Sequence, residues 1–345
     1  MKTTVTIKDI AEQLNLSRNT VAKALNGKYV PEATRERVLN KAIELNYKSL
    51  SSKAPSEKKK KYRILLLACR PLNNIRFFSP IIRAIENECF ENEYDLFQFT
   101  YNATMSTFEV LEEYIMGLNI DGIVAIESFD SNLIKRLLKL NKPMCFIDCC
   151  TNYSTLNGLS FDIIETSNFI PIYEITKNII QKYQLKHFTY VGDETHCLSF
   201  QERYYGMLCA LNSLGIPHSR EDDILKSDNF DYGSTEMLKT AITNLKHTTE
   251  CFICGNDFIA RSICKALEAF GKKVPEDCLV VGFDNVAEAI ASYPKITSVG
   301  TDCTTVGVTA IKTLVKRIEN PNITPIRYSV KSTIIYRQST IKEIG

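Results

Sequence analysis

Long apolar segments are missing from this sequence of 345 residues. No run of about 18 consecutive apolar residues occurs, which is the length that a helix needs to cross a membrane. The chain begins Met1-Lys-Thr-Thr and passes into polar, patterned sequence without the apolar core of a secretory signal. We therefore expect neither a membrane span nor secretion, and we expect the protein to act in the cytoplasm.

Motifs of the common enzyme classes are also missing. Gly192-Asp-Glu and Gly255-Asn-Asp lack the companion residues of a glycine-rich phosphate loop. No serine nucleophile elbow and no HExxH metal motif occurs. The four histidines, which show no metal-ligand spacing, are His187, His196, His218 and His247. The sequence therefore predicts a protein that is not an enzyme, with no catalytic residues, no cofactor and no bound metal.

Disulfide and zinc patterns are absent, although the chain holds 12 cysteines. In a long chain without a secretion signal, cysteines are typically reduced and behave as small hydrophobic residues. Cys251-Phe-Ile-Cys254 is the single CxxC motif, and no second Cys or His pair follows at zinc spacing. It lies on an expected strand, where positions three apart point to opposite faces. We interpret this motif, and the adjacent pair Cys149-Cys150, as core packing rather than as metal or redox sites.

Charge is distributed unevenly along the chain, although the net charge is only +2. Residues 1 to 61 hold 14 Lys and Arg against 6 Asp and Glu, a balance of +8. The remaining residues hold 28 against 34, a balance of −6. A basic segment on an acidic body indicates that only the N-terminal part binds a polyanion. The length also allows two or three folding units.

Three short helices are predicted in the first sixty residues. Thr6 and Asp9 have the spacing of a capping box, and the apolar stripe of a first helix follows. Ser17 can cap a second helix, and Pro31 suits the first turn of a third. The predicted apolar face of the third helix consists of Val38, Leu39, Ala42, Ile43 and Leu45. Two short helices joined by a tight turn predict an all-α, helix-turn-helix headpiece over residues 1–48.

The expected second helix carries side chains that can read DNA. In a helix-turn-helix, the N-terminal residues of this helix face base edges in the major groove. Arg18 and Asn19 occupy that end, and Lys23 follows one turn later. Arg can form two hydrogen bonds with guanine, and Asn can form two with adenine. The alternative is a plain solvated bundle, but the basic charge and the paired caps favour DNA binding.

From Tyr62 onward, short apolar runs alternate with amphipathic helical segments. The expected strands are 64–68, 96–99, 122–126, 143–147, 188–191, 251–253 and 279–281. Expected helices between them include 80–90, 108–116, 171–182 and 258–270. Such alternation predicts parallel, doubly wound sheets. Because these units are too many for one small sheet, we expect two α/β lobes, with ligand bound beyond the carboxyl ends of the strands.

The sequence resembles the lactose-repressor (LacI/GalR) family. The similarity covers residues 6–47, including Thr34-Arg-Glu-Arg-Val38 and Leu45-Asn-Tyr47, and it continues over about 62–336. In the body it is carried by Phe200-Gln-Glu-Arg-Tyr-Tyr-Gly206, Cys254-Gly-Asn-Asp257 and Val274-Pro-Glu-Asp-Cys-Leu-Val-Val-Gly-Phe-Asp-Asn285. The resemblance implies a two-lobed, periplasmic-binding-protein-like effector and dimerisation domain over residues 62–345.

The resemblance also assigns roles to individual residues. Those aligned with base-reading positions are Arg18, Asn19 and Lys23. Those aligned with positions that hold the DNA backbone are Thr6, Ser17, Thr20, Asn26 and Tyr29. Those aligned with effector-binding positions are Phe77, Phe78, Asp148, Ser199, Arg203, Asp257 and Asp302. A structural ion pair is the alternative for Arg203 and Asp257, and we expect Asp284 to stabilise a loop.

Several parts of the sequence depart from the family pattern. Residues 49–61, rich in Ser and Lys, stand where the family has a hinge helix whose Leu kinks DNA, and Ser56 lies near that Leu position. We therefore predict a linker and an operator without the usual kink, with Lys58 to Lys61 either contacting phosphates or only solubilising the linker. Ile163-Ile164-Glu165 replaces a small polar residue and a glycine. Cys149-Cys150 and Cys197 stand near the expected cleft, where polar groups would serve a sugar better.

These features together predict a sequence-specific, DNA-binding transcription repressor. A small molecule bound between the lobes, a sugar or related metabolite, is expected to change its operator affinity through lobe closure. Half-site geometry and the resemblance imply a homodimer on a pseudo-palindromic operator. Two alternatives stay open: a DNA-binding regulator whose ligand-free body is controlled by a partner protein, and a small-molecule-binding protein that does not contact DNA.

Overall fold

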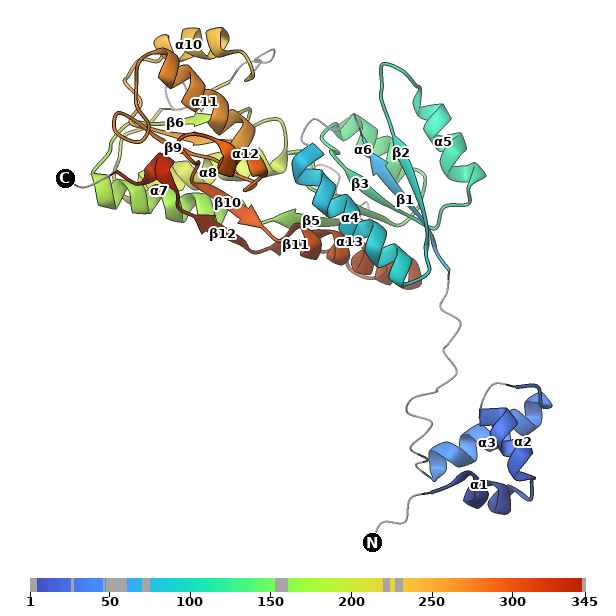
Figure 1. The fold of residues 1–345 in the computed structure, drawn as a ribbon. Helices are drawn as coiled ribbons and strands as arrows, with labels where there is room; N and C mark the ends of the chain where they lie inside the picture. Colours follow the sequence, from blue (N-terminus) through green and yellow to red (C-terminus); the bar gives the residue numbers. More distant parts are fainter. Residues whose placement is uncertain are drawn as a thin grey trace. The chain divides into compact units, whose positions relative to one another are not determined.

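The structure of the chain is a computed structural model that describes residues 5–25, 28–45, 47, 61–69, 75–152, 161–219, 224–226 and 232–342. By internal contacts the chain divides into two units, Met1–Lys60 and Lys61–Gly345. Figure 1 shows a helical first unit and layered helices and strands in the second. No described helix is long and apolar enough to cross a membrane.

The helices of the first unit are α1 (Ile7–Leu14), α2 (Arg18–Leu25) and α3 (Glu32–Glu44). The predicted capping box is present, and the backbone N–H of Thr6 donates to Asp9 Oδ2 over 2.7 Å. Asn15 ends α1 in the left-handed region, with φ of 52°. The backbone N–H of Thr20 then donates to Ser17 Oγ over 3.0 Å and caps α2. The predicted helix-turn-helix is confirmed.

A small apolar core holds these three helices together. Val38 and Ala42 of α3 are buried as predicted. Ile43 was expected on the same face, but it is 67% exposed. It follows Ala42 by one residue, which turns its side chain about 100° around the helix and away from the core. Pro31 lies just before the first helical residue of α3, not in its first turn.

The first lobe of the second unit is built on a six-stranded, wholly parallel sheet with the order β11-β5-β4-β3-β1-β2. Its strands are β1 (Arg63–Ala68), β2 (Asp95–Thr100), β3 (Gly122–Ile126), β4 (Met144–Ile147), β5 (Asp162–Thr166) and β11 (Arg327–Val330). One face packs against α4 (Ile75–Glu91) and α13 (Cys303–Glu319), and the other against α5 (Phe108–Gly117) and α6 (Ser131–Leu138). Burial on both faces explains the continuous apolar runs of β1 and β3.

The second lobe contains a four-stranded parallel sheet with the order β7-β6-β8-β9. Its strands are β6 (Phe188–Val191), β7 (Ile224–Leu225), β8 (Cys251–Cys254) and β9 (Leu279–Val281). One face packs against α7 (Phe169–Tyr183) and α8 (Leu198–Ser213). The other packs against α10 (Thr235–Thr243), α11 (Asp257–Ala269) and α12 (Ala287–Ala291). The predicted arrangement of two parallel α/β lobes is confirmed.

Three segments connect the lobes. They join β5 to α7, β10 (Ser298–Thr301) to α13, and β11 to β12 (Ser332–Ile335). β10 and β12 pair antiparallel, and the short helix η3 (Gln338–Thr340) that follows β12 packs against β9. Because the connections lie side by side, residues far apart in sequence meet where the lobes join.

All seven predicted strands are present, with small shifts at their ends. Cys251 and Cys254 are buried thiols on β8 and pack into the clusters on opposite faces of the sheet, as predicted. The strands β5, β7, β10, β11 and β12 and the helices α6, α8, α10, α12 and α13 were not among the elements named from the sequence. Close packing of α8 on α7 depends on Gly206, where an added Cβ would lie 2.6 Å from the carbonyl oxygen of Phe169.

Candidate functional site

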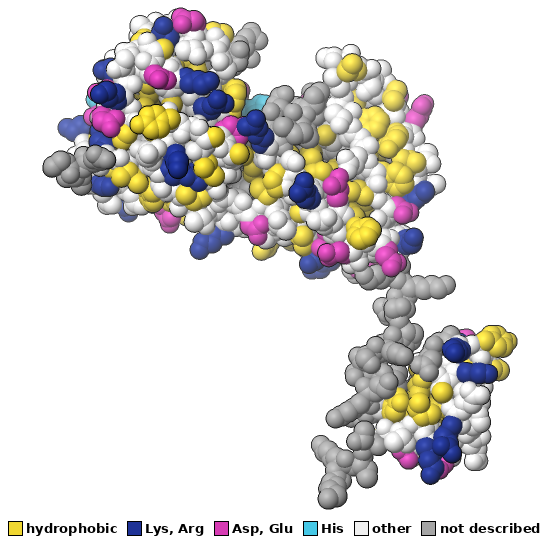
Figure 2. Space-filling model, viewed as in Figure 1, with side chains coloured by type: hydrophobic (Ala, Val, Ile, Leu, Met, Phe, Trp, Pro, Cys, Tyr) yellow, Lys and Arg dark blue, Asp and Glu magenta, His cyan; other side chains and the backbone are white. Residues whose placement is uncertain are grey.

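The outer surface of α2 carries the side chains predicted to read bases. Arg18, Asn19 and Lys23 are exposed, with Arg18 and Asn19 in the first turn. Val21 and Ala24 are buried and hold α2 against the other two helices. Figure 2 shows Lys and Arg side chains on the visible face of this unit. The arrangement presents guanidinium, amide and ammonium groups that can donate hydrogen bonds to DNA.

Some of the residues predicted to hold the DNA backbone cap helices, and others are only exposed. Thr6, Ser17 and Tyr29 are exposed, Tyr29 at 91%. The Thr6 hydroxyl donates to Asp9 Oδ2 over 2.8 Å, and the hydroxyls of Ser17 and Thr20 are 2.8 Å apart. The hydroxyls of Thr6 and Ser17 thus stabilise the starts of α1 and α2, where backbone N–H groups point outward and can receive a phosphate.

Some predictions for the DNA-binding part lie outside the described residues. They concern Asn26 and linker residues 49–60, including Ser56 and Lys58 to Lys60. The predictions of a non-helical linker and of an operator without the usual kink therefore stay predictions.

Arg203 is the central polar group of the second unit. It lies in the first turns of α8, which follows β6, and its side chain is buried. Its Nε donates to Asn168 Oδ1 over 3.0 Å, and a terminal nitrogen donates to the carbonyl of Gly255. Its other terminal nitrogen lies 3.6 Å from Asp284 Oδ1. The guanidinium also lies over the ring of Phe283, 3.5 Å from its centre, so its position is strongly fixed.

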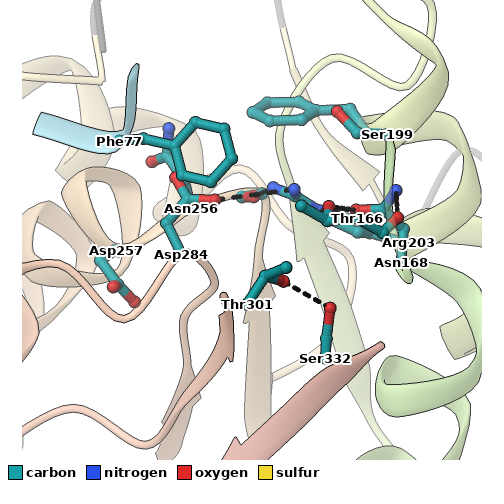
Figure 3. Close-up of polar contacts among 12 residues, drawn as sticks. Phe77, Thr166, Asn168, Ser199, Arg203, Asn256, Asp257, Asp284, Thr301 and Ser332 are labelled. Carbon is teal, nitrogen blue, oxygen red and sulfur yellow. Dashed lines mark hydrogen bonds and ion pairs between the residues drawn. The ribbon is translucent and has the colours of Figure 1, made fainter. Parts of the chain in front are cut away.

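Asp284 faces Arg203 from the loop that follows β9. Its φ of 96° is unusual for a residue with a side chain, and its backbone N–H donates to the carbonyl of Val299 over 2.8 Å. Figure 3 shows Arg203 reaching toward Asp284, with Phe77 nearby. We expected Asp284 only to stabilise its loop. The missed signal was its place just beyond the apolar strand β9, at the edge where parallel sheets bind ligands.

An open cavity of about 740 Å³ lies between α4 and the loops that follow β9 and β10. Phe77, Asp284, Asn285 and Thr301 are among the residues that line it. Of the seven predicted effector residues, Phe77 alone lines this cavity. Asp148, Ser199 and Arg203 lie where the two lobes join. Phe78, Asp257 and Asp302 make packing, loop and capping contacts instead.

Asp257 lies in the interior rather than in the cavity, and Figure 3 shows it apart from Arg203. Ser298 Oγ donates to its Oδ1 over 2.6 Å, and the backbone N–H of Val286 donates to its Oδ2 over 2.9 Å. Burial, and then the charge of Asp284, raise the pKa of Asp257 to about 7. Direct ligand contact by Asp257 is at odds with this geometry, because both oxygens already support the loop that carries Asp284.

Asp148 and Ser199 join the two lobes directly. Asp148 follows β4 of the first lobe, and the hydroxyl of Ser199 on α8 donates to its Oδ2 over 2.6 Å. The backbone N–H of Cys149 donates to Asp148 Oδ1 over 2.8 Å. Burial raises the pKa of Asp148, while these hydrogen bonds and Arg203 oppose the rise. Both residues therefore lie where the two lobes join, and their predicted contact with an effector stays a prediction.

Phe78 and Asp302 have structural roles in this conformation. Phe78 is buried in the core between the first sheet, α4 and α13, so it does not offer a face to a ligand. Asp302 accepts hydrogen bonds from the backbone of Thr304 and the hydroxyl of Thr305 and caps α13. Both predicted ligand contacts are at odds with these packing and capping contacts.

Further polar groups gather near Arg203, and sequence reasoning did not single them out. Asn256 follows β8 and accepts the backbone N–H of Ile259 over 3.0 Å. The hydroxyls of Thr301 and Ser332 lie 2.6 Å apart, where β10 and β12 meet (Figure 3). By contrast, the cleft cysteines Cys149, Cys150 and Cys197 are buried. Among the described residues, no group of His, Cys, Asp and Glu has the arrangement of a metal site.

Comparison with known proteins identifies the two parts of the chain. Residues 6–49 match the model of bacterial regulatory proteins of the lacI family, and residues 182–340 match the periplasmic binding protein-like domain. The repressor PurR of Vibrio parahaemolyticus is 27% identical over 99% of both chains. The ribose operon repressor of Haemophilus influenzae is 26% identical over 97% of this chain and 98% of its own.

Solved structures show the same fold. A complex of the transcriptional regulator CelR with cellobiose has a TM-score of 0.67 at 21% identity, over 97% of this chain and 99% of the other. The Lac repressor dimer bound to operator and the anti-inducer ONPF has a TM-score of 0.68 at 17% identity, over 99% and 100%. A helix-turn-helix joined to this two-lobed body defines a DNA-binding transcription regulator. The chain thus joins a domain of the lacI family of bacterial regulatory proteins to a periplasmic binding protein-like domain, and it is similar to repressors over nearly its whole length.

Proposed function

We propose that this regulator is a repressor whose affinity for its operator changes when a small molecule binds between the two lobes. The observation that supports it is the gathering of Arg203, Asp284, Asn256 and Asp148 beyond the carboxyl ends of β6, β9, β8 and β4. The proposal assigns residues 1–48 to DNA binding, 49–61 to a linker and 62–345 to effector binding and dimerisation. It includes no catalytic step, and it places the protein in the cytoplasm with the DNA.

The proposed effector is an uncharged sugar or a related polyol. The charge of Arg203 is already opposed by Asp284, and two of its donors bind Asn168 and Gly255. A ligand carboxylate would compete with Asp284, whereas hydroxyl groups can donate to carboxylates and accept from amides at the same time. Phe77 offers an apolar ring for the face of a sugar. Two relatives are described as a complex with cellobiose and as a ribose operon repressor, so both sugars are suitable first probes.

Calorimetry with ribose and cellobiose, followed by a wider screen of sugars and metabolites, tests the effector proposal. Arg203→Ala should abolish the ligand response and leave DNA binding intact. Arg136→Ala removes an arginine from an exposed ion pair with Glu109 and serves as the matched control. Unchanged ligand affinity in a folded Arg203→Ala protein would remove Arg203 from the site. A body that binds no small molecule would favour control by a partner protein.

The proposed DNA contacts are those of the predicted set, with Arg18 and Asn19 as the main base readers. Selection of bound sequences from random DNA would define the operator, which we expect to be pseudo-palindromic. Arg18→Ala or Asn19→Ala should relax discrimination between operator and non-operator DNA. Arg37→Ala removes the same charge from the exposed side of α3 and is the control. Equal discrimination by wild type and Arg18→Ala would contradict the assigned role.

A homodimer would place two headpieces on the two half-sites of such an operator. Large apolar side chains exposed near α11 and α12 support an interface there, namely Phe258, Ile290 and Tyr293. Sedimentation velocity measures the oligomeric state, and a purely monomeric protein at micromolar concentration would contradict the proposal.

A DNA-bending assay tests the linker, since the predicted linker should leave the operator nearly straight.

A further inference from the structure

A second cluster of charged side chains joins the lobes beside the connection from β5 to α7. Arg327 on β11 lies 2.8 Å from Glu165 Oε2 on β5, and the same nitrogen contacts Glu202 on α8. β5 and β11 belong to the sheet of the first lobe, whereas α8 belongs to the second. One guanidinium therefore holds a carboxylate from each lobe.

Asn168 occupies the connection itself, and its side chain is buried. Its Oδ1 accepts from Arg203 Nε over 3.0 Å and from Thr166 Oγ1 over 3.1 Å. Its Nδ2 donates to the carbonyl of Thr166 over 2.7 Å and to Glu202 Oε2 over 3.4 Å. The amide thus uses its acceptor and both of its donors, a combination that a carboxylate cannot reproduce.

The two clusters are linked through α8. Glu202 and Arg203 are neighbours in sequence, about 100° apart around the helix, so they face different partners. Glu202 contacts Arg327, whereas Arg203 faces Asp284. Asn168 contacts both of them. A continuous chain of polar contacts therefore runs from Arg327 through Glu202 and Asn168 to Arg203.

We propose that Arg327 and Asn168 are positioning residues that couple the closure of the two lobes to the orientation of Arg203 in the effector site. Asn168 bonds to Thr166 of the first lobe and to Glu202 and Arg203 of the second. A change in the angle between the lobes cannot preserve all of these bonds, so opening the lobes frees the Nε side of the Arg203 guanidinium, which is then held by Gly255 and Asp284 of the second lobe. This inference rests on the proposed effector role of the cleft.

The buried Glu165 makes the cluster sensitive to the loss of Arg327. Burial, and then the charge of Glu202, raise the pKa of Glu165 to about 7, while Arg327 opposes the rise and Asp148 adds to it. Without Arg327, two carboxylates from different lobes would face each other with no shared cation. Whether Glu165 then keeps its charge without a partner or takes up a proton, the bridge between the lobes is lost, so the lobes should separate more readily.

Hydrogen–deuterium exchange of the full-length protein, without ligand, tests this coupling. Arg327→Met is the main variant, because its side chain is 34% exposed and the fold should tolerate the change. Amide exchange in the loop 282–286 should become about fivefold faster, as expected for the loss of about one hydrogen bond. The described contacts of Arg327 do not extend to this loop. Asn168→Asp keeps the shape but removes both donors, so it should act in the same direction.

Two controls separate coupling from general loosening. Arg136→Met breaks the ion pair with Glu109 in the same lobe and should leave exchange at 282–286 unchanged. In an Arg203→Met background, Arg327→Met should add nothing further at this loop, because the chain of contacts is already broken. Independent effects in the double variant, or unchanged exchange in Arg327→Met, would overturn the inference.

The outcome does not depend on finding the ligand. If no sugar binds, the proposed effector fails, but the exchange results stand because no ligand is added. If Asn168→Asp does not fold, Arg327→Met and its double variant decide the question, since Arg327 is only partly buried.

Discussion

Replacement of Asp257 with asparagine separates a structural role from a ligand contact. Asp257 is 0% exposed, and the surrounding structure raises its pKa from 3.8 to about 7. In the unfolded chain the ordinary value applies. Between about pH 4 and pH 7 the folded state therefore binds more protons than the unfolded state, so stability falls as the pH rises through this range.

The size of the effect follows from the two pKa values. A rise from 3.8 to about 7 corresponds to about 4 kcal/mol of stability lost by pH 7, and asparagine carries no charge to cause this loss. Asparagine can also keep both contacts, with Oδ1 accepting from the N–H of Val286 and Nδ2 donating to Ser298 Oγ. We expect equal stability near pH 4, and an Asp257→Asn variant more stable by up to about 4 kcal/mol at pH 8.

Urea unfolding at about pH 4.5 and about pH 8 measures this difference, followed by far-UV circular dichroism because the chain has no tryptophan. The raised pKa of Glu165 affects both proteins and cancels in their difference. Asp302→Asn is the control, because this change should lower the stability of the folded protein at the higher pH instead of raising it. Hydrogen bonds from Thr305 and Thr304 lower the Asp302 pKa, so its ionised form stabilises the fold above pH 4 and is lost in the variant.

Two results would refute the reasoning. An Asp257→Asn protein no more stable than wild type at pH 8 would contradict the buried, costly carboxylate. Loss of effector binding in a stable Asp257→Asn protein would place Asp257 in the ligand site after all.

Three further predictions concern packing, capping and thiols. Gly206→Ala should destabilise the second unit by about 1–3 kcal/mol through its clash with the carbonyl of Phe169, and an unchanged Tm would contradict the close approach of α7 and α8. Ser17→Ala should cost the headpiece about 1 kcal/mol in thermal unfolding, whereas Ser17→Asp should retain the cap. With a thiol reagent, exposed Cys209 should react first, and Cys254 should react only on unfolding, because burial raises the pKa of the Cys254 thiol. Fast labelling of Cys254 in the native protein would contradict this expectation.

The headpiece could be predicted closely because its signals are local. The caps formed by Thr6 and Ser17 and the spacing of Ile10 and Val21 determine the helices within a few residues of each side chain. The same holds for strands such as β3, whose apolar run matches burial on both faces. The error at Ile43 arose because it follows Ala42 by one residue, so its side chain points about 100° away from the buried face of α3.

The strand β5 was missed because its stability depends on distant residues. Asp162 and Glu165 interrupt the apolar pattern of a buried strand. Asp162 is neutralised by Arg317, with contacts of 2.5 and 2.7 Å, and Glu165 by Arg327. These partners lie more than 150 residues further along the chain. Local sequence contains no sign that they return to this strand.

The sequence by itself determined that a DNA-reading headpiece precedes a two-lobed α/β body with polar groups at its strand ends. Only the tertiary structure decided which carboxylate faces Arg203. Asp257 and Asp284 both follow apolar strands, and each is a plausible ligand contact by pattern. Packing against Gly282 and Ser298 turns Asp257 inward, whereas the positive φ of Asp284 turns it toward Arg203. Sequence position alone does not fix the direction of a side chain at a strand end, because that direction depends on neighbours that only folding brings together.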